Sequence, residues 1–318
     1  MKITNLRNLP QAYVNAVTFD DHKKGKGFSV TEMIKPLRMI WLRKRHEDEL
    51  VEDASKRVWA LLGQAIHAIL ERNAEKDSLQ EEYLSAEING VELTGTPDLL
   101  NSSGLLSDWK LTTAWSAVYG SRIKDYTEQL NCYAWLYAKH GFIAKKAEVV
   151  AIYRDWDQNK IYSKNYPQYN MERVDIELWL PETQEAFISK RINDIMKYEH
   201  TPDNELPLCT PDEKWERPDV WAVMKKGRKS AFRLHDTQKA AEDMVKVGKG
   251  KGDEVVLRKG ECKRCMKYCP VNLQCNTYLA AAGSPPPVGE FEATLNAAKA
   301  KFRPEEATID MLISESDK

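Results

Sequence analysis

The chain has 318 residues, a formal net charge of −1 and 42% hydrophobic residues, which is the composition of an ordinary globular protein with one large or two small domains. It has no apolar run long enough to span a membrane, and residues 1–11 lack the apolar core of a signal peptide, so we expect a cytoplasmic protein. The charge is unevenly distributed. Residues 223–267 hold fourteen Lys/Arg against six Asp/Glu, an excess that suits a polyanion but also occurs on surfaces without one.

Two helices are predicted near the N-terminus. Ser29 and Glu32 have the spacing of a capping box and predict a helix running toward Leu50. A second helix is predicted over residues 53–74. It has one apolar stripe that we expect to be buried: Val58, Leu61, Leu62, Ala65, Ile66, Ile69 and Leu70.

The next segments predict antiparallel strands. Residues 82–92 alternate in polarity and carry Asn89-Gly90, a hairpin signal, and residues 92–100 and 104–111 predict two further strands. A three-residue loop at residues 102–104, with Gly104 in the left-handed conformation, is a favoured connection between them.

The length of this loop decides where two acids lie. With three loop residues, Leu100 pairs with Leu106 and Asp98 lies opposite Asp108, whereas a two- or four-residue loop pairs Asp98 with Ser107. The odd-length loop is therefore part of the hypothesis that the two carboxylates meet.

The remaining pattern predicts a helix over residues 121–140 with Gly141 as its cap, strands over 146–156 and 172–179, and a helix over 181–198. A basic hairpin at 224–233, a short helix and a flexible break at 248–252 follow. The order predicts an α/β fold. We expect a core at residues 1–200, a connection and basic insertion at 201–261, a cysteine-rich segment packing on the core at 262–282, and a partly disordered tail at 283–318.

Asp98, Asp108 and Lys110 are the first candidate site. Residues two apart on a strand share a face, so Asp108 and Lys110 project together. Two adjacent carboxylates repel unless a hard divalent cation lies between them, and Mg²⁺ or Mn²⁺ prefers oxygen ligands and keeps waters, one of which can become a nucleophile. The simpler alternative, a surface hairpin with solvated charges, holds for most Asp-x-Lys tripeptides.

Further motifs stand in a fixed order around this pair. His67 lies in "GQAIHAILE" on the second predicted helix, "GTPDLL" and "SDWKLT" carry the acids, and Gln129 and Tyr133 in "EQLNCYAWL" are four apart on one helix face. Each motif alone is weak. Their order and spacing over residues 29–278 resemble the PD-(D/E)XK nuclease superfamily, within it the RecB-like branch that includes phage-type exonucleases.

The resemblance implies a restriction-endonuclease-like mixed central sheet flanked by helices, with a basic hairpin-helix insertion and a C-terminal cysteine cluster. It implies that Asp98, Asp108, His67 and the Trp109 carbonyl bind Mg²⁺ or Mn²⁺. Lys110 would position or activate the attacking water, and Gln129 and Tyr133 would hold the substrate strand or brace the site. Glu87 is a possible outer ligand, although a solvated hairpin charge explains it equally well.

The reaction implied is hydrolysis of DNA by in-line attack of water on a phosphodiester. We expect an exonuclease that resects DNA ends in phage-type recombination or repair, beside a single-strand annealing protein and in the host cytoplasm if a phage encodes it. A structure-specific or nicking endonuclease with the same site is the alternative. A non-catalytic DNA-binding module is a third reading, which the intact acids and Lys110 disfavour.

Six cysteines occur, and the four at 262, 265, 269 and 275 are too densely spaced for chance. Disulfides are rare in the cytoplasm, so these thiols indicate Zn²⁺ or an iron–sulfur cluster. Cys132 lies inside the predicted Gln129–Tyr133 helix and reads as a buried core residue.

The RecB-like resemblance favours a [4Fe–4S] cluster, with Zn²⁺ as the alternative. Several relatives hold the cluster with one remote cysteine, usually before the histidine motif and next to a proline, and three near the C-terminus. Here that place reads Lys35-Pro36, so the usual remote ligand is missing. Either the four C-terminal cysteines bind locally, with Cys262 included, or Cys209 joins Cys265, Cys269 and Cys275, which we favour slightly.

The basic insertion is the candidate DNA-binding surface. Phosphate contacts by Lys and Arg and stacking by the interleaved Trp221 and Phe232 suit a nucleic-acid strand, although a solvated hairpin is the simpler reading. The basic residues are Lys225, Lys226, Arg228, Lys229 and Arg233.

Overall fold

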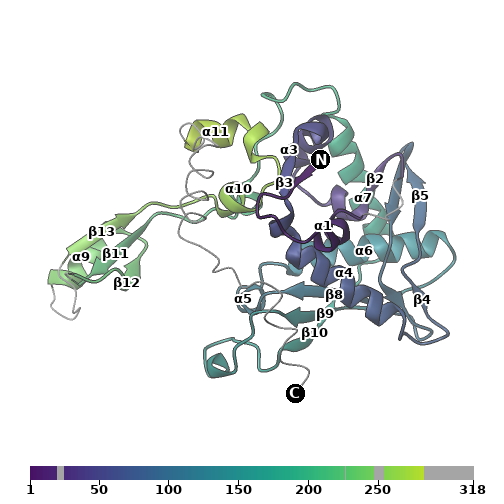
Figure 1. The fold of residues 1–318 in the computed structure, drawn as a ribbon, viewed down its shortest axis with the longest axis horizontal. Helices are drawn as coiled ribbons and strands as arrows, with labels where there is room; N and C mark the ends of the chain where they lie inside the picture. The colour runs from purple at the N-terminus through teal and green to yellow at the C-terminus, as the bar shows by residue number, and fades with distance from the viewer. Residues whose placement is uncertain (20–24, 226, 247–253, 283–318) are drawn as a thin grey trace, which may run out of the picture. The chain divides into compact units, whose positions relative to one another are not determined.

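The computed structural model describes residues 1–19, 25–225, 227–246 and 254–282, and Figure 1 shows them as coloured ribbon. The chain forms two compact units, Met1–Gln274 and Cys275–Lys318. In the second unit the described part is Cys275 and helix α11 (Asn276–Ala282). The predicted flexible break at 248–252 and the predicted tail at 283–318 lie outside the described residues.

A five-stranded mixed sheet forms the centre of the first unit. Its strand order is β10-β9-β8-β7-β4, in which β8 and β9 are parallel and the other neighbours antiparallel. Their bounds are β4 (Leu79–Gln80), β7 (Leu99–Leu100), β8 (Leu105–Thr112), β9 (Lys146–Tyr153) and β10 (Met171–Ile176). This mixed α/β architecture confirms the predicted fold class at that level.

The predicted hairpin register between β7 and β8 is confirmed. Leu100 pairs with Leu106, and Gly104 has a φ of +85°, which glycine adopts without the strain a side chain would add. The Asn101 side chain accepts from the backbone N–H groups of Ser103 and Leu105 and so closes the three-residue loop.

A second sheet has the order β2-β6-β5, with β2 (Phe28–Ser29) parallel to β6 (Val91–Gly95) and β5 (Leu84–Ile88) antiparallel to it. Asn89 and Gly90, with φ of +52° and +73°, make the predicted hairpin turn. The prediction of one strand over residues 92–100 is wrong. Because Pro97 has no N–H to donate, pairing stops after Gly95 and the chain crosses to the central sheet before β7.

Helix α6 (Ile123–Lys139) contacts both sheets, and α7 (Pro181–Met196) packs on α6 and β5. Both were predicted, and Gly141 beyond α6 has a φ of +85°. Together with α5 (Ala114–Val118), α6 forms the crossover that parallel neighbours β8 and β9 require. The predicted burial of Cys132 is confirmed, since its exposed fraction is 0%.

The N-terminal helix prediction is wrong in its length. The Ser29 hydroxyl accepts from the Glu32 N–H and caps α2 (Val30–Met33), but a new helix, α3 (Leu37–Arg45), starts after Pro36. A proline disfavours helical backbone at the residue before it, so the helix ends before Pro36 and a new one begins after it.

The second predicted helix consists of a 3-10 turn, η2 (Ala54–Arg57), followed by α4 (Val58–Glu71). Its expected buried stripe is only half-buried, because none of the residues of α4 is fully buried and Leu62 and Ile69 are 42% and 53% exposed. Leu62 and Ile69 lie within the predicted stripe, so the described elements that contact α4 leave part of its apolar face uncovered.

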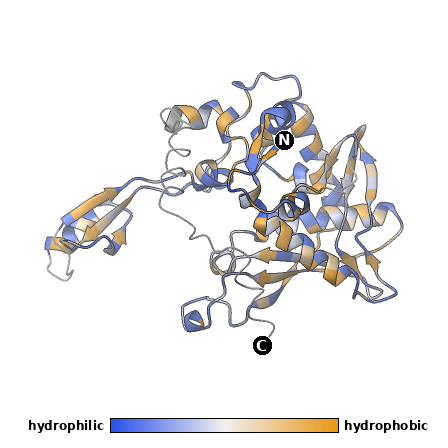
Figure 2. Cartoon of the chain, in the orientation of Figure 1, coloured by the Kyte–Doolittle hydropathy of each residue, from blue (hydrophilic) through white to orange (hydrophobic). Residues whose placement is uncertain are grey.

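The basic segment forms a three-stranded sheet of order β12-β11-β13, which we call the arm. It consists of β11 (Val220–Met224), β12 (Ala231–His235), α9 (Gln238–Lys246) and β13 (Glu254–Arg258). The hairpin and helix were predicted, and β13 was not. Ala222 and Ala241, both 0% exposed, lie in a small apolar core between sheet and helix, orange in Figure 2.

The remaining elements are short. Strand β1 (Lys2–Thr4) pairs in parallel with β3 (Val51–Asp53). The others are α1 (Gln11–Thr18), η1 (Glu47–Glu49), η3 (Gln158–Lys160), α8 (Pro211–Lys214), α10 (Lys263–Lys267) and η4 (Asn272–Gln274). Among the described residues, no helix combines the length and apolarity that crossing a membrane demands.

Gly95 allows the close approach of α6 to β6. A Cβ at this position would lie 2.8 Å from Cε1 of Tyr133 and 2.9 Å from Cδ1 of Leu136. Gly95→Ala should therefore lower the free energy of unfolding by about 1–3 kcal/mol, as overpacking of a core does.

Gly63 in α4 provides the matched control, because a Cβ there meets nothing within 4 Å. Gly63→Ala should raise the free energy of unfolding by about 1 kcal/mol, since alanine favours the helix. Urea denaturation of both variants tests the pair, and equal effects of the two substitutions would contradict the packing argument.

Candidate metal centre and active site

Three acidic residues lie next to one another where β4, β7 and β8 run side by side. Leu99 of β7 pairs with Gln80 on one side and with Ser107 on the other. One residue further along, the same register brings Glu81, Asp98 and Asp108 together across three chain segments. The Glu81 N–H donates to the Asp98 carbonyl at 3.2 Å, which continues the β4–β7 pairing to this point.

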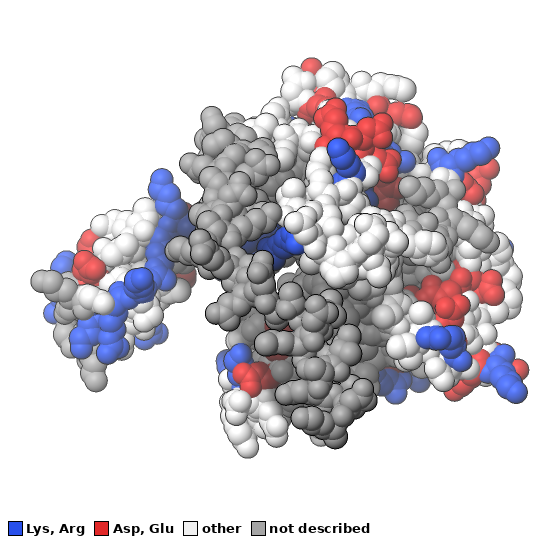
Figure 3. All heavy atoms as spheres, in the orientation of Figure 1, with Lys and Arg blue, Asp and Glu red and all other residues white. Residues whose placement is uncertain are grey.

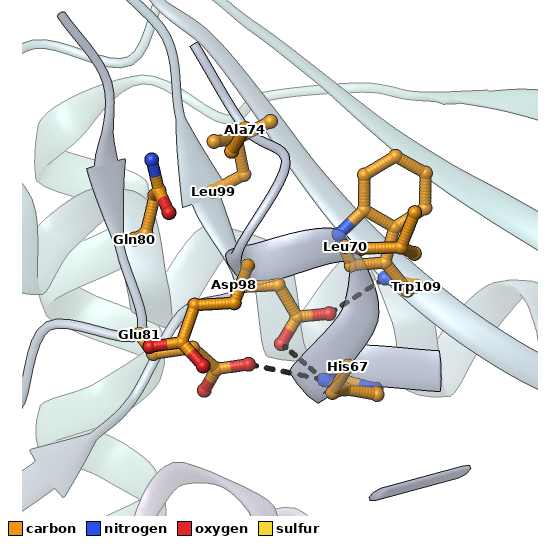
Figure 4. A pocket seen from close by; sticks show the side chains of 9 residues that line it. His67, Leu70, Ala74, Gln80, Glu81, Asp98, Leu99 and Trp109 are labelled. Atoms are coloured by element: carbon orange, nitrogen blue, oxygen red, sulfur yellow. Dashed lines mark hydrogen bonds and ion pairs between the residues drawn. The ribbon is translucent and has the colours of Figure 1, made fainter. Parts of the chain in front are cut away.

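Helix α4 brings His67 to this group. Its Nδ1 lies 3.1 Å from Oε1 of Glu81 and 3.6 Å from Oδ1 of Asp98, and Figure 4 shows the imidazole pointing toward both carboxylates. Ligand atoms of the three residues lie within 4.8 Å of one another. In the part of the chain that the structure describes, they form the one group of three or more His, Cys, Asp or Glu residues this compact.

Glu81 holds its place at a conformational cost. Its φ of +47° lies in the left-handed region, which non-glycine residues adopt rarely and usually where surrounding structure enforces it. The enforcing contacts here are the backbone hydrogen bond to Asp98 and the contact of the Glu81 carboxylate with His67.

Asp98 is the most strongly perturbed acid of the group. It is 9% exposed, and its Oδ2 accepts a 2.6 Å hydrogen bond from the Trp109 N–H. Burial, followed by the charge of Asp108, raises the pKa of Asp98 to about 7. The two carboxylates are therefore close enough to repel each other, although Asp108 is not a member of the compact group with His67.

Asp108 is held from the α6 side of the sheet. It is 1% exposed, Nζ of Lys110 lies 2.5 Å from its Oδ2, and Nε2 of Gln129 donates to its Oδ1 at 3.4 Å. Gln129 also donates to the Tyr133 hydroxyl at 3.1 Å. Gln129 thus contacts both Asp108 and Tyr133, and the roles of Gln129 and Tyr133 in the site stay predictions.

Lys110 stays charged despite its surroundings. Burial lowers the pKa of its ammonium group, but the charges of Asp108 and Asp98 outweigh burial and hold this pKa above its ordinary value. The pKa of His67 is also raised, first by its hydrogen bond with Glu81. Both shifts reflect an excess of negative charge in a partly dry site, which a divalent cation would neutralise.

The buried Oδ2 of Asp108 has the Lys110 ammonium as its ion-pair partner at 2.5 Å. The compact donor set for a cation is His67, Glu81 and Asp98. One imidazole and two carboxylates fit a cation of intermediate hardness, such as Mn²⁺.

The structure brings together most residues that the motifs singled out and adds one. Glu81 was not predicted from the sequence as a site residue, because the strand before it has only two residues. The feature that could have indicated it is the acidic pair Glu81-Glu82 directly after this short strand. Glu87 is exposed on β5 opposite Glu92, outside the compact group, as the solvated-charge reading expected. The role of the Trp109 carbonyl stays a prediction.

The cysteine-bearing segments of the first unit pack on one another. Helix α8, which follows Cys209, contacts α10, which carries Cys265, and Cys262 forms an isolated β-bridge with Glu216. Nη1 of Arg264 in α10 donates to the Glu213 carbonyl at 3.2 Å. Cys275 belongs to the second unit. Which four thiols share a cluster stays a prediction.

Most of the predicted DNA-binding residues lie at the tip and edge of the arm. Lys225, Arg228, Lys229 and Arg233 are exposed, and none of them forms an ion pair within the described residues. Lys226 lies outside the described residues. Figure 3 shows Lys and Arg side chains gathered on this face of the arm.

No family model matches the chain, and neither does any curated protein. Similar solved structures include SSO0001 (18% identity, 60% of this chain and 85% of that one, TM-score 0.41). They also include the alkaline exonuclease LHK-Exo from Laribacter hongkongensis (14% identity, 55% and 89%, TM-score 0.32). A third is a phage-related exonuclease from Haemophilus somnus 129PT (14% identity, 61% and 80%, TM-score 0.28).

Exonucleases, the class that the motifs resemble, are thus among the structural neighbours.

The His67–Glu81–Asp98 group should bind Mn²⁺ and couple that binding to stability. At a concentration about 100 times its Kd, Mn²⁺ should raise the free energy of unfolding by about 2.7 kcal/mol. Asp98→Asn should abolish this response. Differential scanning fluorimetry with and without Mn²⁺ detects the response of each protein as a shift in Tm. Glu87→Gln is the control and should respond like the wild type; an unchanged response in Asp98→Asn would contradict the assigned site.

Proposed function

We propose that this protein is a metal-dependent deoxyribonuclease that hydrolyses phosphodiester bonds. The observation that carries the proposal is the register of β4, β7 and β8, which sets Glu81, Asp98 and Asp108 side by side with Lys110 against the last of them. Solvated surface charges, the simpler reading of an Asp-x-Lys hairpin, would not be 9% and 1% exposed as Asp98 and Asp108 are.

His67, Glu81 and Asp98 would hold the cation, and Asp108 and the Trp109 carbonyl are the further ligands that we propose. When bound, Mg²⁺ or Mn²⁺ supplies a Lewis acid that polarises the phosphate and lowers the pKa of a coordinated water. The mixed imidazole and carboxylate donors suit Mn²⁺ somewhat better than Mg²⁺.

The protein residues have separable tasks around that cation. Lys110 orients the attacking water and offsets charge that builds up on the phosphate in the transition state. Gln129 and Tyr133 fix the carboxylate of Asp108, and the Trp109 N–H fixes that of Asp98. Because the acids are buried and braced before substrate arrives, little reorganisation is needed during the reaction.

The exposed cations of the arm support the proposal that DNA is the substrate. These cations have no acidic partner within the described residues, as expected of groups that contact phosphates. We further propose an exonuclease that resects ends in recombination or repair, as phage-type enzymes do, with a single-strand annealing protein as a partner. A nicking or structure-specific endonuclease would use the same residues.

End-labelled linear DNA and closed circular DNA, each with Mg²⁺ and with Mn²⁺, separate these reactions. An exonuclease degrades the linear substrate and leaves the closed circle intact. Nicks in the circle would instead favour the endonuclease, and no cleavage of either substrate with either cation would refute the proposed function.

Asp108→Asn is the most direct test of the chemistry. It preserves the size of the side chain but removes the charge that Lys110 and the cation require, so cleavage should fall by at least about a thousandfold. DNA affinity, measured by fluorescence anisotropy, should change by less than about threefold, since the arm is intact. Retained cleavage in a preparation free of host nucleases would disprove the role of Asp108.

The arm should determine how binding depends on salt. Replacing Lys225, Lys226, Arg228 and Lys229 with Gln should weaken DNA binding and reduce the slope of log K against log salt by up to about 3. Lys190→Gln with Lys197→Gln, two exposed cations at α7, is the control and should keep the wild-type slope. An unchanged slope in the arm variant would exclude it as a phosphate-binding surface.

We also propose a [4Fe–4S] cluster bound by Cys209, Cys265, Cys269 and Cys275, with Zn²⁺ as the alternative. The packing of α8 on α10 supports a shared site, because it holds the segment after Cys209 against the one that carries Cys265. A bound cluster would fix the chain on either side of the arm.

A brown protein absorbing near about 400 nm would establish iron–sulfur rather than zinc. Anaerobically purified Cys209→Ser should lose this absorbance while Cys262→Ser keeps it. The opposite result would place all four ligands among the C-terminal cysteines.

A further inference from the structure

Helix α5 presents two exposed aromatic rings directly after the strand that carries Asp108 and Lys110. Trp115 is 42% exposed and Tyr119 is 72% exposed. Their ring centroids are 6.1 Å apart and their planes differ by 25°, so the rings are stacked on each other. Contact of large apolar rings with water is unfavourable, and such rings on a protein surface often mark a site where a partner binds.

The helix that precedes Tyr119 and carries Trp115 lies on the side of the sheet that Lys110 faces. Asp108, Lys110 and Thr112 alternate along β8 and therefore share one face. On that face the Thr112 hydroxyl lies 2.9 Å from the Ser116 hydroxyl, which is in α5 between the two aromatic residues. Figure 1 shows α5 beside the ends of β8 and β9.

Trp115 and its helix are held rigidly. The Ala114 N–H donates to Oδ1 of Asp155 at 2.6 Å, which fixes the first turn of α5 to the chain after β9. Tyr166, 3% exposed, packs edge-on against Trp115 at 5.8 Å, and its hydroxyl accepts from the Asp157 N–H at 3.0 Å. A ring that is already ordered loses little conformational entropy when a ligand binds.

Two arginines lie close to this helix along the chain. The exposed Arg154 donates its backbone N–H to the Thr112 carbonyl at 3.0 Å, and its guanidinium lies over the Trp59 ring at 4.4 Å. Arg122 follows Tyr119 by three residues and pairs with Asp125 at 3.4 Å. Rings for bases and guanidinium groups for phosphates are the combination by which single-stranded nucleic acid is bound.

We propose that Trp115 and Tyr119 form a platform on which nucleobases of a DNA strand stack as its backbone reaches Lys110 and Asp108. The inference deepens the proposed nuclease function and rests on it. It assigns to α5 the task of holding single-stranded DNA, because a base in the interior of a duplex is already stacked on both of its faces.

The test measures binding of a fluorescein-labelled single-stranded oligonucleotide by anisotropy, with Asp108→Asn in every protein to prevent cleavage. Tyr119→Ala and Trp115→Ala should each weaken binding about tenfold, whereas Tyr119→Phe should bind normally because it keeps the ring. With an oligonucleotide of the same length that carries abasic sites, the alanine variants and the parent should bind equally.

Phe142→Ala is the matched control. Phe142 is 44% exposed and lies beyond the other end of α6, before β9 begins, so removing its ring should not change binding. Thermal unfolding of each variant verifies folding, and Tyr119→Ala carries the test if loss of the Trp115–Tyr166 contact destabilises the other variant.

Equal affinities of Tyr119→Ala and its parent for the base-bearing strand would refute the stacking platform and favour a protein partner for the two rings. Equal weakening toward the base-bearing and abasic strands would overturn it as well, since stacking requires bases. If wild type cleaves DNA while these variants bind normally, only the platform fails. If wild type neither binds nor cleaves DNA, the proposed function fails.

Discussion

The pairing of β7 with both of its neighbours determines where every acid of the site lies. β7 has two residues, yet Leu99 fixes Gln80 on one side and Ser107 on the other, so Glu81, Asp98 and Asp108 follow in register. A slip of one residue on either side would send one carboxylate to the opposite face. The three-residue loop closed by Asn101 and Gly104 prevents such a slip on the β8 side.

Two helices then contact different members of this group of acids. α4 brings His67 to Asp98 and Glu81, whereas α6 brings Gln129 and Tyr133 to Asp108. Asp98 lies between these groups, and burial together with the charge of Asp108 raises its pKa to about 7. Gly95 allows this arrangement, because a Cβ there would lie 2.8 Å from the Tyr133 side chain and 2.9 Å from the Leu136 side chain of α6.

The features that the sequence predicted depend on local chemistry, such as the glycine in the 102–104 loop, the Asn89-Gly90 turn and the four-residue spacing of Gln129 and Tyr133. Glu81 was not predicted, because the strand before it, β4, is two residues long and the position of Glu81 depends on non-local pairing with β7. The incomplete burial of α4 has the same origin, since an apolar pattern does not reveal how much of a helix its neighbours cover. Pro36 and Pro97 each indicate a break in the chain's regular structure. The predictions of a continuous helix past Pro36 and a continuous strand past Pro97 did not take these breaks into account.

The location of a bound cation tests the central claim most directly. Crystals soaked in Mn²⁺ would reveal the ion by its anomalous scattering, independently of any activity. The account predicts a peak in direct contact with the carboxylates of Asp98 and Glu81 and with the His67 imidazole. A Mn²⁺ peak away from all three, or none at a concentration that supports DNA cleavage, would contradict it.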